Sequence, residues 1–188
     1  MSSEASISSQ YKPSLVLDLD ETLIFSTLIK TQNTNFSIRV GRIRLYIQTR
    51  PGLEDFFKLI SPFYEIFIYT ASKKEYANLI IDHIAPEVPE SHRLFSDSIR
   101  VFDGYLAKDL RLIDKECNQI ILVDNSPSSG VLQPKNFLGI TGWYGEEDDK
   151  VLLHQLAPLL IQCANQNDII DFLKSFLIKD QYRDLYLI

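Results

Sequence analysis

Apolar residues form short unbroken runs in some parts of the chain and alternate with polar residues in others. The run that starts at Ser14 leads into Asp18-Leu-Asp20, which predicts a buried strand with acids at its end. Similar runs at about 63–69 and 119–123 predict two further buried strands. These three segments are the expected centre of a sheet.

Two other segments have the pattern of paired strands. Residues 36–50 alternate between apolar and polar side chains on either side of Gly41-Arg42, which suits a two-residue type II′ turn and predicts a β-hairpin. Residues 93–107 predict short strands around the turn Asp103-Gly104.

Helices are predicted between these strands, at about 51–60, 73–84, 150–163 and 168–177. Pro51 suits the first position of a helix. Ser72 and Glu75 have the spacing of a capping box, in which both side chains satisfy free backbone N–H groups. Pro158 interrupts the third helix.

The alternation of strands and helices predicts an α/β fold, with a Rossmann-like, mostly parallel sheet flanked by helices on both faces. A small β-hairpin insertion at about 26–49 is expected near the active site. The expected domain is 14–178, after a flexible Ser-rich tail at 1–13. For the C-terminal tail, 179–188, packing on the domain, contact with a partner and disorder all stay open.

Chemically useful side chains follow all three buried strands. Asp18 and Asp20 project to the same side of an extended chain, Thr70 follows the second strand, and Asp124-Asn125 follows the third. Ligands bind at the carboxyl ends of strands in such sheets. Converging carboxylates repel one another unless a cation joins them, and Mg²⁺ prefers oxygen ligands. The pattern therefore suggests phosphoryl transfer, although each turn alone is most simply a polar loop.

Composition and charge limit the number of domains, the partners and the cellular location that we expect. The chain has 188 residues with a net charge of −6, so we expect one domain, a monomer, and no direct contact with nucleic acid. No apolar run is long enough to span a bilayer, and no secretory signal is visible, so we expect a nuclear or cytoplasmic protein without a membrane span. Cys117 and Cys163 are expected to be two buried free thiols.

The stretch Val16–Ile24, with the sequence VLDLDETLI, resembles the D-x-D-x-T signature of haloacid-dehalogenase-type phosphatases. Within that superfamily, four more stretches resemble the small phosphatases that act on the RNA polymerase II C-terminal domain, also called NLI-interacting-factor-like phosphatases. They are Arg50-Pro51-Gly52, Tyr69–Ser72, Gly104–Leu110 and Ile121–Pro127. The resemblance runs from about 14 to 176.

The resemblance implies a role for individual residues. Asp18 would be the nucleophile that forms an aspartyl-phosphate, and Asp20 the acid that protonates the leaving oxygen and then activates water. The resemblance places the phosphate against Thr70, Ser72 and Lys108. The Mg²⁺ ligands would be the Asp18 carboxylate, the Asp20 carbonyl, Asp124 and Asn125.

The chain departs from the family where substrate choice lies. Lys73 stands where polymerase-tail phosphatases carry an apolar residue, and Ser96 follows Leu94-Phe95 where they carry an arginine, whereas Tyr76 is kept as a substrate-binding residue. The resemblance therefore implies a Mg²⁺-dependent protein serine/threonine phosphatase. Its substrate would be the polymerase C-terminal domain or another phosphoprotein. Alternatives are a catalytically silent phosphoprotein-binding scaffold and a small-molecule phosphatase.

The hairpin carries a local excess of positive charge. No acidic residue occurs between Thr22 and Leu53, and the hairpin holds Arg39, Arg42 and Arg44 on the face opposite its apolar side chains. These arginines are candidates for attracting an acidic or multiply phosphorylated substrate. The alternative is a solvated face that keeps an exposed strand soluble.

Overall fold

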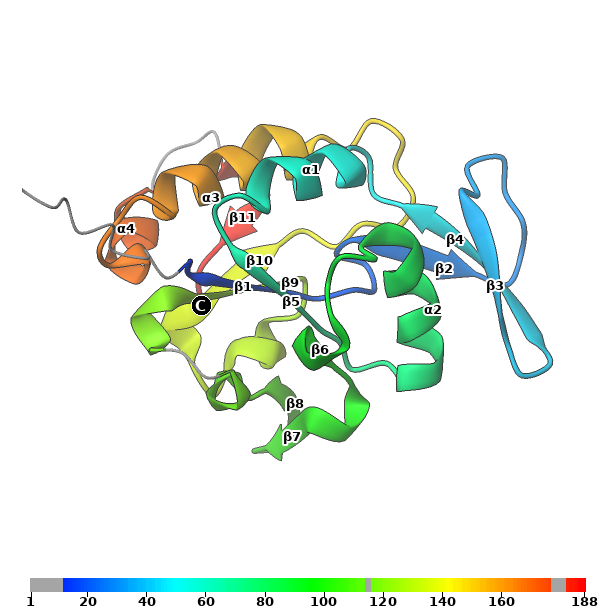
Figure 1. Cartoon of the computed structure of the whole chain (residues 1–188), viewed down its shortest axis with the longest axis horizontal. Coiled ribbons are helices and arrows are strands. Elements are labelled where there is room, and N and C mark those ends of the chain that lie inside the picture. Colours follow the sequence, from blue (N-terminus) through cyan, green and yellow to red (C-terminus); the bar gives the residue numbers. More distant parts are fainter. Residues whose placement is uncertain (1–11, 114–115, 177–181) are drawn as a thin grey trace, which may run out of the picture.

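A six-stranded sheet forms the centre of the computed structural model, which describes residues 12–113, 116–176 and 182–188 (Figure 1). Its strands lie in the order β11-β10-β9-β1-β5-β6. They are β1 (Ser14–Leu17), β5 (Glu65–Tyr69), β6 (Arg93–Leu94), β9 (Ile120–Asp124), β10 (Phe137–Ile140) and β11 (Leu185–Tyr186). All but β11 run parallel, so the predicted mostly parallel α/β sheet is confirmed.

The central strand, β1, is buried on both faces. Leu15 and Leu17 belong to one hydrophobic cluster, and Val16 belongs to the cluster on the other side of the sheet. Such double burial explains why β1 is a continuous apolar run rather than an alternating one.

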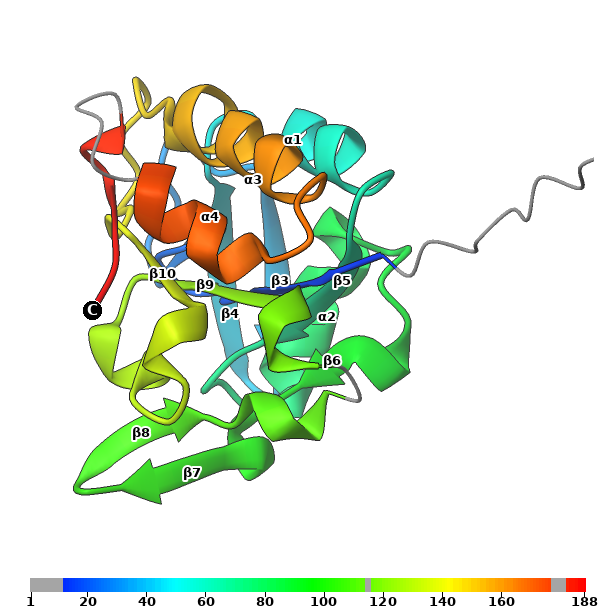
Figure 2. The ribbon, with the colours of Figure 1, turned by 90° about the vertical axis from the view of Figure 1, so that its left-hand side faces the viewer.

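The four α-helices bury their apolar faces in the same cluster as Leu15 and Leu17. They are α1 (Leu53–Ile60), α2 (Lys74–Ile84), α3 (Ala157–Cys163) and α4 (Ile169–Phe176). Figure 2 shows α1, α3 and α4 together over one face of the sheet. A π-helical turn, Leu152–Leu156, precedes α3 close to Pro158, whose ring cannot continue the regular hydrogen-bonding pattern.

Short 3₁₀ helices, rather than α-helices, accompany the cluster around Val16. They include Leu110–Leu112, Cys117–Gln119, Pro127–Gly130 and Pro134–Asn136, and two more lie at Glu90–His92 and Ser96–Ser98. Leu110 and Ile113 fill this side of the core together with Tyr69. The two faces of the sheet are thus covered unequally in the described residues.

Two small sheets stand beside the central one. The first joins β2 (Ile24–Thr27), β4 (Ile43–Thr49) and β3 (Phe36–Val40), and it contains the predicted hairpin with its turn at Gly41-Arg42. The second is a ribbon of β7 (Ile99–Phe102) and β8 (Tyr105–Lys108) around Asp103-Gly104.

Three local predictions are wrong. Helix α1 begins at Leu53 instead of Pro51, because Gly52 takes a left-handed conformation with φ of 79°. Ser72 does not cap α2: the N-cap is Lys73, and the Ser72 hydroxyl donates to Asp20 instead. Cys117 is exposed, and only the second thiol, Cys163, is buried.

The described part of the C-terminal tail, 182–188, packs on the domain. Tyr182 and Leu185 are buried, and β11 pairs with the edge of β10. Of the N-terminal tail, the described residues are Lys12 and Pro13, and the Pro13 carbonyl accepts a hydrogen bond from the Glu65 N–H. The rest of that tail lies outside the described residues, as do 177–181. No helix in the described ranges is long and apolar enough to cross a membrane.

Gly139 allows the β11 edge to close on β10. A Cβ atom at this position would lie 2.3 Å from the Tyr186 ring, so Gly139→Ala should force the ring away. We expect a loss of about 1–3 kcal/mol in the free energy of unfolding, measured by urea denaturation. In a Tyr186→Ala background the same substitution should cost much less, since the clashing ring is gone. Equal costs in the two backgrounds would show that this contact does not limit residue 139.

Candidate active site

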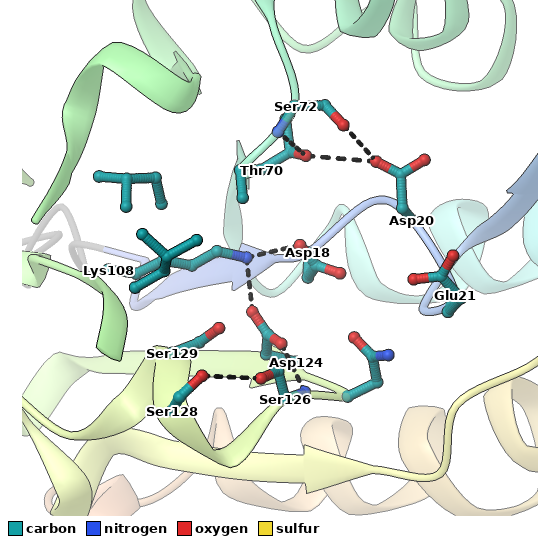
Figure 3. Close-up of a pocket in the computed structure, with 14 residues that line it drawn as sticks. Asp18, Asp20, Glu21, Thr70, Ser72, Lys108, Asp124, Ser126, Ser128 and Ser129 are labelled. Atoms are coloured by element: carbon teal, nitrogen blue, oxygen red, sulfur yellow. Dashed lines mark hydrogen bonds and ion pairs between the residues drawn. The ribbon is translucent and has the colours of Figure 1, made fainter. Parts of the chain in front are cut away.

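The register of the sheet brings the three strand ends together. Leu17 of β1 lies opposite Ile68 of β5 and Val123 of β9, and the Asp18 N–H donates to the Val123 carbonyl at 2.9 Å. The side chains that follow these strands line one cavity of about 460 Å³ (Figure 3). Its walls include Asp18, Asp20, Thr70, Ser72, Lys108, Asp124 and Asn125. The structure therefore collects every residue that the sequence assigned to phosphate or metal.

Lys108 joins two of the carboxylates. Its ammonium group lies 2.5 Å from Asp18 Oδ1 and 2.5 Å from Asp124 Oδ2, and its side chain is 2% exposed. The ammonium also lies 5.7 Å from the centre of the Tyr69 ring. The Tyr69 hydroxyl is anchored in turn, since it donates to the Ser98 carbonyl at 2.5 Å. Lys108 is thus held between the Tyr69 ring and the two carboxylates.

The cavity carries more negative than positive charge. Four carboxylates line it, from Asp18, Asp20, Glu21 and Asp124, with Lys108 as the one ammonium among the lining residues. Burial raises the pKa of Asp18 to about 7; Lys108 opposes this shift, and Asp124 and Asp20 add to it. Burial acts to lower the pKa of Lys108, but Asp18 and Asp124 together raise it above its ordinary value.

Three hydroxyl groups surround the Asp20 carboxylate. Tyr76 donates to Oδ1 at 2.5 Å, Ser72 donates to Oδ2 at 2.7 Å, and the Thr70 hydroxyl lies 3.5 Å from Oδ2. The Thr70 hydroxyl also accepts the Ser72 N–H at 3.0 Å. Asp20 is therefore turned toward β5 and the start of α2, whereas Asp18 is turned toward Lys108, as Figure 3 shows.

The backbone between the two acids and β2 forms a tight turn. Glu21 has a left-handed φ of 55°, and the Glu21 carbonyl accepts the Trp143 N–H at 2.8 Å. Buried Arg50 holds the other side: it donates to the Thr22 carbonyl at 3.2 Å and to both oxygens of Asp149 at 3.0 and 2.8 Å. This bidentate pair ties the turn to the segment after β10.

The donor set suits a hard divalent cation. The Thr22 hydroxyl lies 3.1 Å from Asp18 Oδ2 and 3.4 Å from Asn125 Oδ1, so these oxygens face one small region. In the described ranges no three His, Cys, Asp or Glu side chains make a metal cluster by themselves. Mg²⁺ is bound through one or two carboxylates with water and phosphate oxygens, so two aspartates and an amide fit it.

A second cavity, of about 520 Å³, adjoins the first. It lies between the three-stranded sheet and α2, and it shares Asp20 and Ser72 with the first cavity. Its walls are mainly apolar and include Leu28, Val40, Ile43, Leu45 and Tyr76, with Lys73 and Glu75 as the charged members beside Asp20. Tyr76 thus lines the second cavity and donates to Asp20, which lines both cavities.

The arginines of the hairpin lie elsewhere. Val40, Ile43 and Leu45 turn toward the second cavity, so the alternating positions Arg39 and Arg44 face away from it. Neither these two nor Arg42 lines either cavity. Any effect of these arginines on a substrate would act at a distance, and their part in binding stays a prediction.

Several residues that hold the site have no distinctive pattern in the sequence. Arg50 is visible only as part of a motif, and no local pattern marks Asp149, Thr22 or Tyr69 for their own chemistry. The available signal for Arg50 was a lone cation directly before Pro51-Gly52. Asp149 ends a run of four acids, and nothing in that run distinguishes it.

Comparison with known proteins places this site in a family. A family model described as NLI interacting factor-like phosphatase matches residues 13–170. The chain is 35% identical to the Dictyostelium discoideum "CTD small phosphatase-like protein 2" over 162 residues, covering 84% of this chain and 28% of that protein. It is 30% identical to the human "Carboxy-terminal domain RNA polymerase II polypeptide A small phosphatase 1", covering 91% of this chain and 67% of that protein. It thus spans between about a quarter and two thirds of these relatives.

The fold is similar to that of solved structures. The fission yeast RNA polymerase II CTD phosphatase Fcp1-R271A bound to beryllium fluoride aligns with a TM-score of 0.58 at 19% identity, over 94% of this chain and 58% of that one. The predicted resemblance to NLI-interacting-factor-like phosphatases and the predicted α/β fold class are therefore confirmed. Because the family model matches most of this chain, the chain belongs to the NLI interacting factor-like phosphatase family.

Proposed function

We propose that this protein is a Mg²⁺-dependent phosphoprotein phosphatase that works through an aspartyl-phosphate on Asp18. The observation that supports it most is the position of Asp18, whose carboxylate binds the buried Lys108 ammonium that also binds Asp124, while Asp20 lines the same cavity. A nucleophile, a buried cation and a second acid are thereby gathered at one strand end. The phosphatase names of the relatives support the same conclusion.

The proposed reaction has two balanced steps. In the first, an Asp18 oxygen attacks phosphorus, the bond to the ester oxygen breaks, and Asp20 gives its proton to that oxygen. In the second, Asp20 takes a proton from water, whose oxygen attacks phosphorus and releases phosphate and the Asp18 carboxylate. Both steps need Asp20 close to the phosphate, and the hydroxyls of Tyr76 and Ser72 hold it in the wall that the two cavities share.

The remaining residues of the site would stabilise the negative charge of the phosphate. Lys108 and the hydroxyls of Thr70 and Ser72 would bind the phosphate oxygens, where negative charge is concentrated in the transition state. Asp18, Asp124, Asn125 and the Asp20 carbonyl would hold Mg²⁺. When bound, the cation supplies positive charge that offsets the excess of carboxylates and neutralises phosphate.

The shape of the site favours a polypeptide substrate. The two cavities meet at Asp20 and Ser72, so an extended chain could place a phosphorylated side chain in one and a neighbouring side chain in the other. Lys73 adds a charge to the second cavity, which makes a phosphoprotein other than the polymerase C-terminal domain as good a candidate as that domain. These walls do not form a closed pocket for a metabolite.

Asp18→Asn should abolish turnover of p-nitrophenyl phosphate, because an amide cannot form the acyl-phosphate. The change keeps size and shape, so folding should survive, as circular dichroism would check. Asp97→Asn alters an exposed aspartate and is the matched control, with activity expected to match the wild type. Retention of more than a few per cent of activity by Asp18→Asn would refute the covalent route. A wild-type protein that binds phosphopeptides without hydrolysing them would instead be the silent scaffold.

Removal of divalent cations with EDTA should silence the enzyme, and added Mg²⁺ should restore it. Asp124→Asn keeps shape but removes a ligand charge, so it should raise the Mg²⁺ concentration for half activity by at least about tenfold. The KM for p-nitrophenyl phosphate at saturating Mg²⁺ should change much less. Full activity in EDTA would rule out the metal-dependent mechanism.

Tyr76→Phe should reveal what the hydroxyl does for Asp20. Loss of this donor should slow hydrolysis of a phosphoserine peptide, whose alkoxide needs a proton, by about 3- to 10-fold in kcat, a fraction of what a general acid contributes. Hydrolysis of p-nitrophenyl phosphate should change less, because p-nitrophenolate leaves without a proton. Tyr46→Phe, which touches neither cavity, is the control. An equal loss on both substrates would contradict a link between Tyr76 and proton transfer.

A further inference from the structure

The ribbon of β7 and β8 carries a dense group of exposed apolar side chains. Val101 is 76% exposed, Phe102 51%, Tyr105 54% and Leu106 56%. Isolated apolar residues on a surface need no explanation, but a contiguous group beside a site marks a binding surface. Figure 2 shows the ribbon standing out from the body of the protein, on the side away from α1, α3 and α4.

One face of the ribbon belongs to the active site. In the antiparallel register, Ile99 lies opposite Lys108 and Val101 lies opposite Leu106. Directly paired residues, and residues two apart in a strand, share a face. Ile99, Val101 and Leu106 therefore lie on the face of Lys108, whose ammonium binds Asp18.

The lining of the active-site cavity includes the part of this ribbon face that is nearest to Lys108. Ile99 and Leu106 line the cavity that holds Asp18 and Asp124, and Val101 extends the same wall outward. Leu106 is two residues from Lys108, or about 7 Å along the strand. An extended substrate advances by about the same amount in two residues, so the wall lies next to the immediate neighbours of a bound phosphoresidue.

The opposite face of the ribbon offers a comparison. Phe102 and Tyr105 are also paired with each other, and they alternate with Val101 and Leu106 along the two strands. They share their face with Arg100 and Ala107, not with Lys108. They are similarly exposed but do not line the cavity.

We propose that Ile99, Leu106 and Val101 form a docking wall for a large apolar residue within three positions of the phosphorylated residue in a polypeptide substrate. This wall lies on the Lys108 side of Asp18, whereas the cavity between the hairpin and α2 lies on the Asp20 side. The substrate would thus be read on both sides of its phosphate. The inference rests on the proposed phosphatase function and adds a sequence preference to it.

The occupant follows from the position of the wall. The apolar strip begins at the ammonium that faces the phosphate site and runs outward from it, so a ligand on the strip is joined to a group in the cavity. The exposed strip continues past the cavity lining to Val101, so it suits a ligand that extends beyond the phosphorylated group, as a polypeptide does. A second copy of the chain has no need of contact with the cavity, so self-association is an alternative that the experiment tests.

The experiment compares two double variants on matched peptides. Each phosphoserine peptide carries one leucine, at one of the three positions before or after the phosphoserine. All its other residues are Gly or Ser. The measured quantity is the ratio of kcat/KM with leucine to kcat/KM with glycine at that position. Val101→Thr/Leu106→Thr removes the wall, and Phe102→Thr/Tyr105→Thr removes the equivalent pair from the other face, in both cases with a residue that favours strands.

Wild type should prefer leucine by about 3- to 10-fold at one or more positions on the side of the wall, from partial burial of the leucine side chain. The Val101/Leu106 variant should lose this preference, and the Phe102/Tyr105 variant should keep it. Preferences that come from the other cavity should be unchanged in both.

Three outcomes would overturn the docking wall. One is a leucine preference equally reduced in both variants, which would mean that the fold of the ribbon matters and not its face. Another is an undiminished preference in the Val101/Leu106 variant. The third is a wild-type dimer in size-exclusion chromatography that this variant alone converts to a monomer without changing the preference. Hydrolysis of p-nitrophenyl phosphate by wild type tests the phosphatase function separately. If wild type does not hydrolyse it, the docking wall is refuted as a substrate site together with the phosphatase function.

Discussion

The parallel pairing of β1 with both β5 and β9 is the constraint on which the site depends. It places Asp18 next to the residues that follow Tyr69 and Val123, and so it sets a crowd of carboxylates at one edge of the sheet. Burial disfavours the charged form of Asp18 and raises its pKa to about 7, and the nearby carboxylates of Asp124 and Asp20 add to this cost. Lys108 offsets part of the cost from a separate ribbon, which ties the position of β8 to the charge at the strand ends.

Rigid support for these acids comes from residues that do not face the substrate. Arg50 and Trp143 hold the carbonyls of Thr22 and Glu21, so the turn between Asp18 and β2 is fixed from two directions. Each acid has its own surroundings: Asp18 faces an ammonium, and Asp20 faces hydroxyls. Two carboxylates with different neighbours can take the different roles of nucleophile and proton carrier.

The proposed chemistry and the proposed substrate contacts use different parts of the fold. The proposed reacting acids follow a strand of the central sheet, whereas the ribbon lines the first cavity and the three-stranded sheet lines the second. Because these sheets are insertions between core strands, their side chains can change without disturbing the register of β1. The apolar ribbon face is a local feature of this kind, and Lys73, at the start of α2, likewise lies outside the core strands.

The sequence by itself determined the three central strands, the two hairpins, the sheet type and the strand-end acids, because buried strands and turns leave short-range patterns in a chain. Its patterns do not predict β2, β10 or β11. It failed at Ser72, whose spacing indicated a cap but whose hydroxyl is turned to donate to the Asp20 carboxylate, a partner that is far away in the chain. Only the tertiary structure paired Arg50 with Asp149, turned the hairpin arginines away from the cavities and set Val101 in line with Lys108. Those outcomes depend on strand register and on contacts between residues far apart in the chain, which no local pattern records.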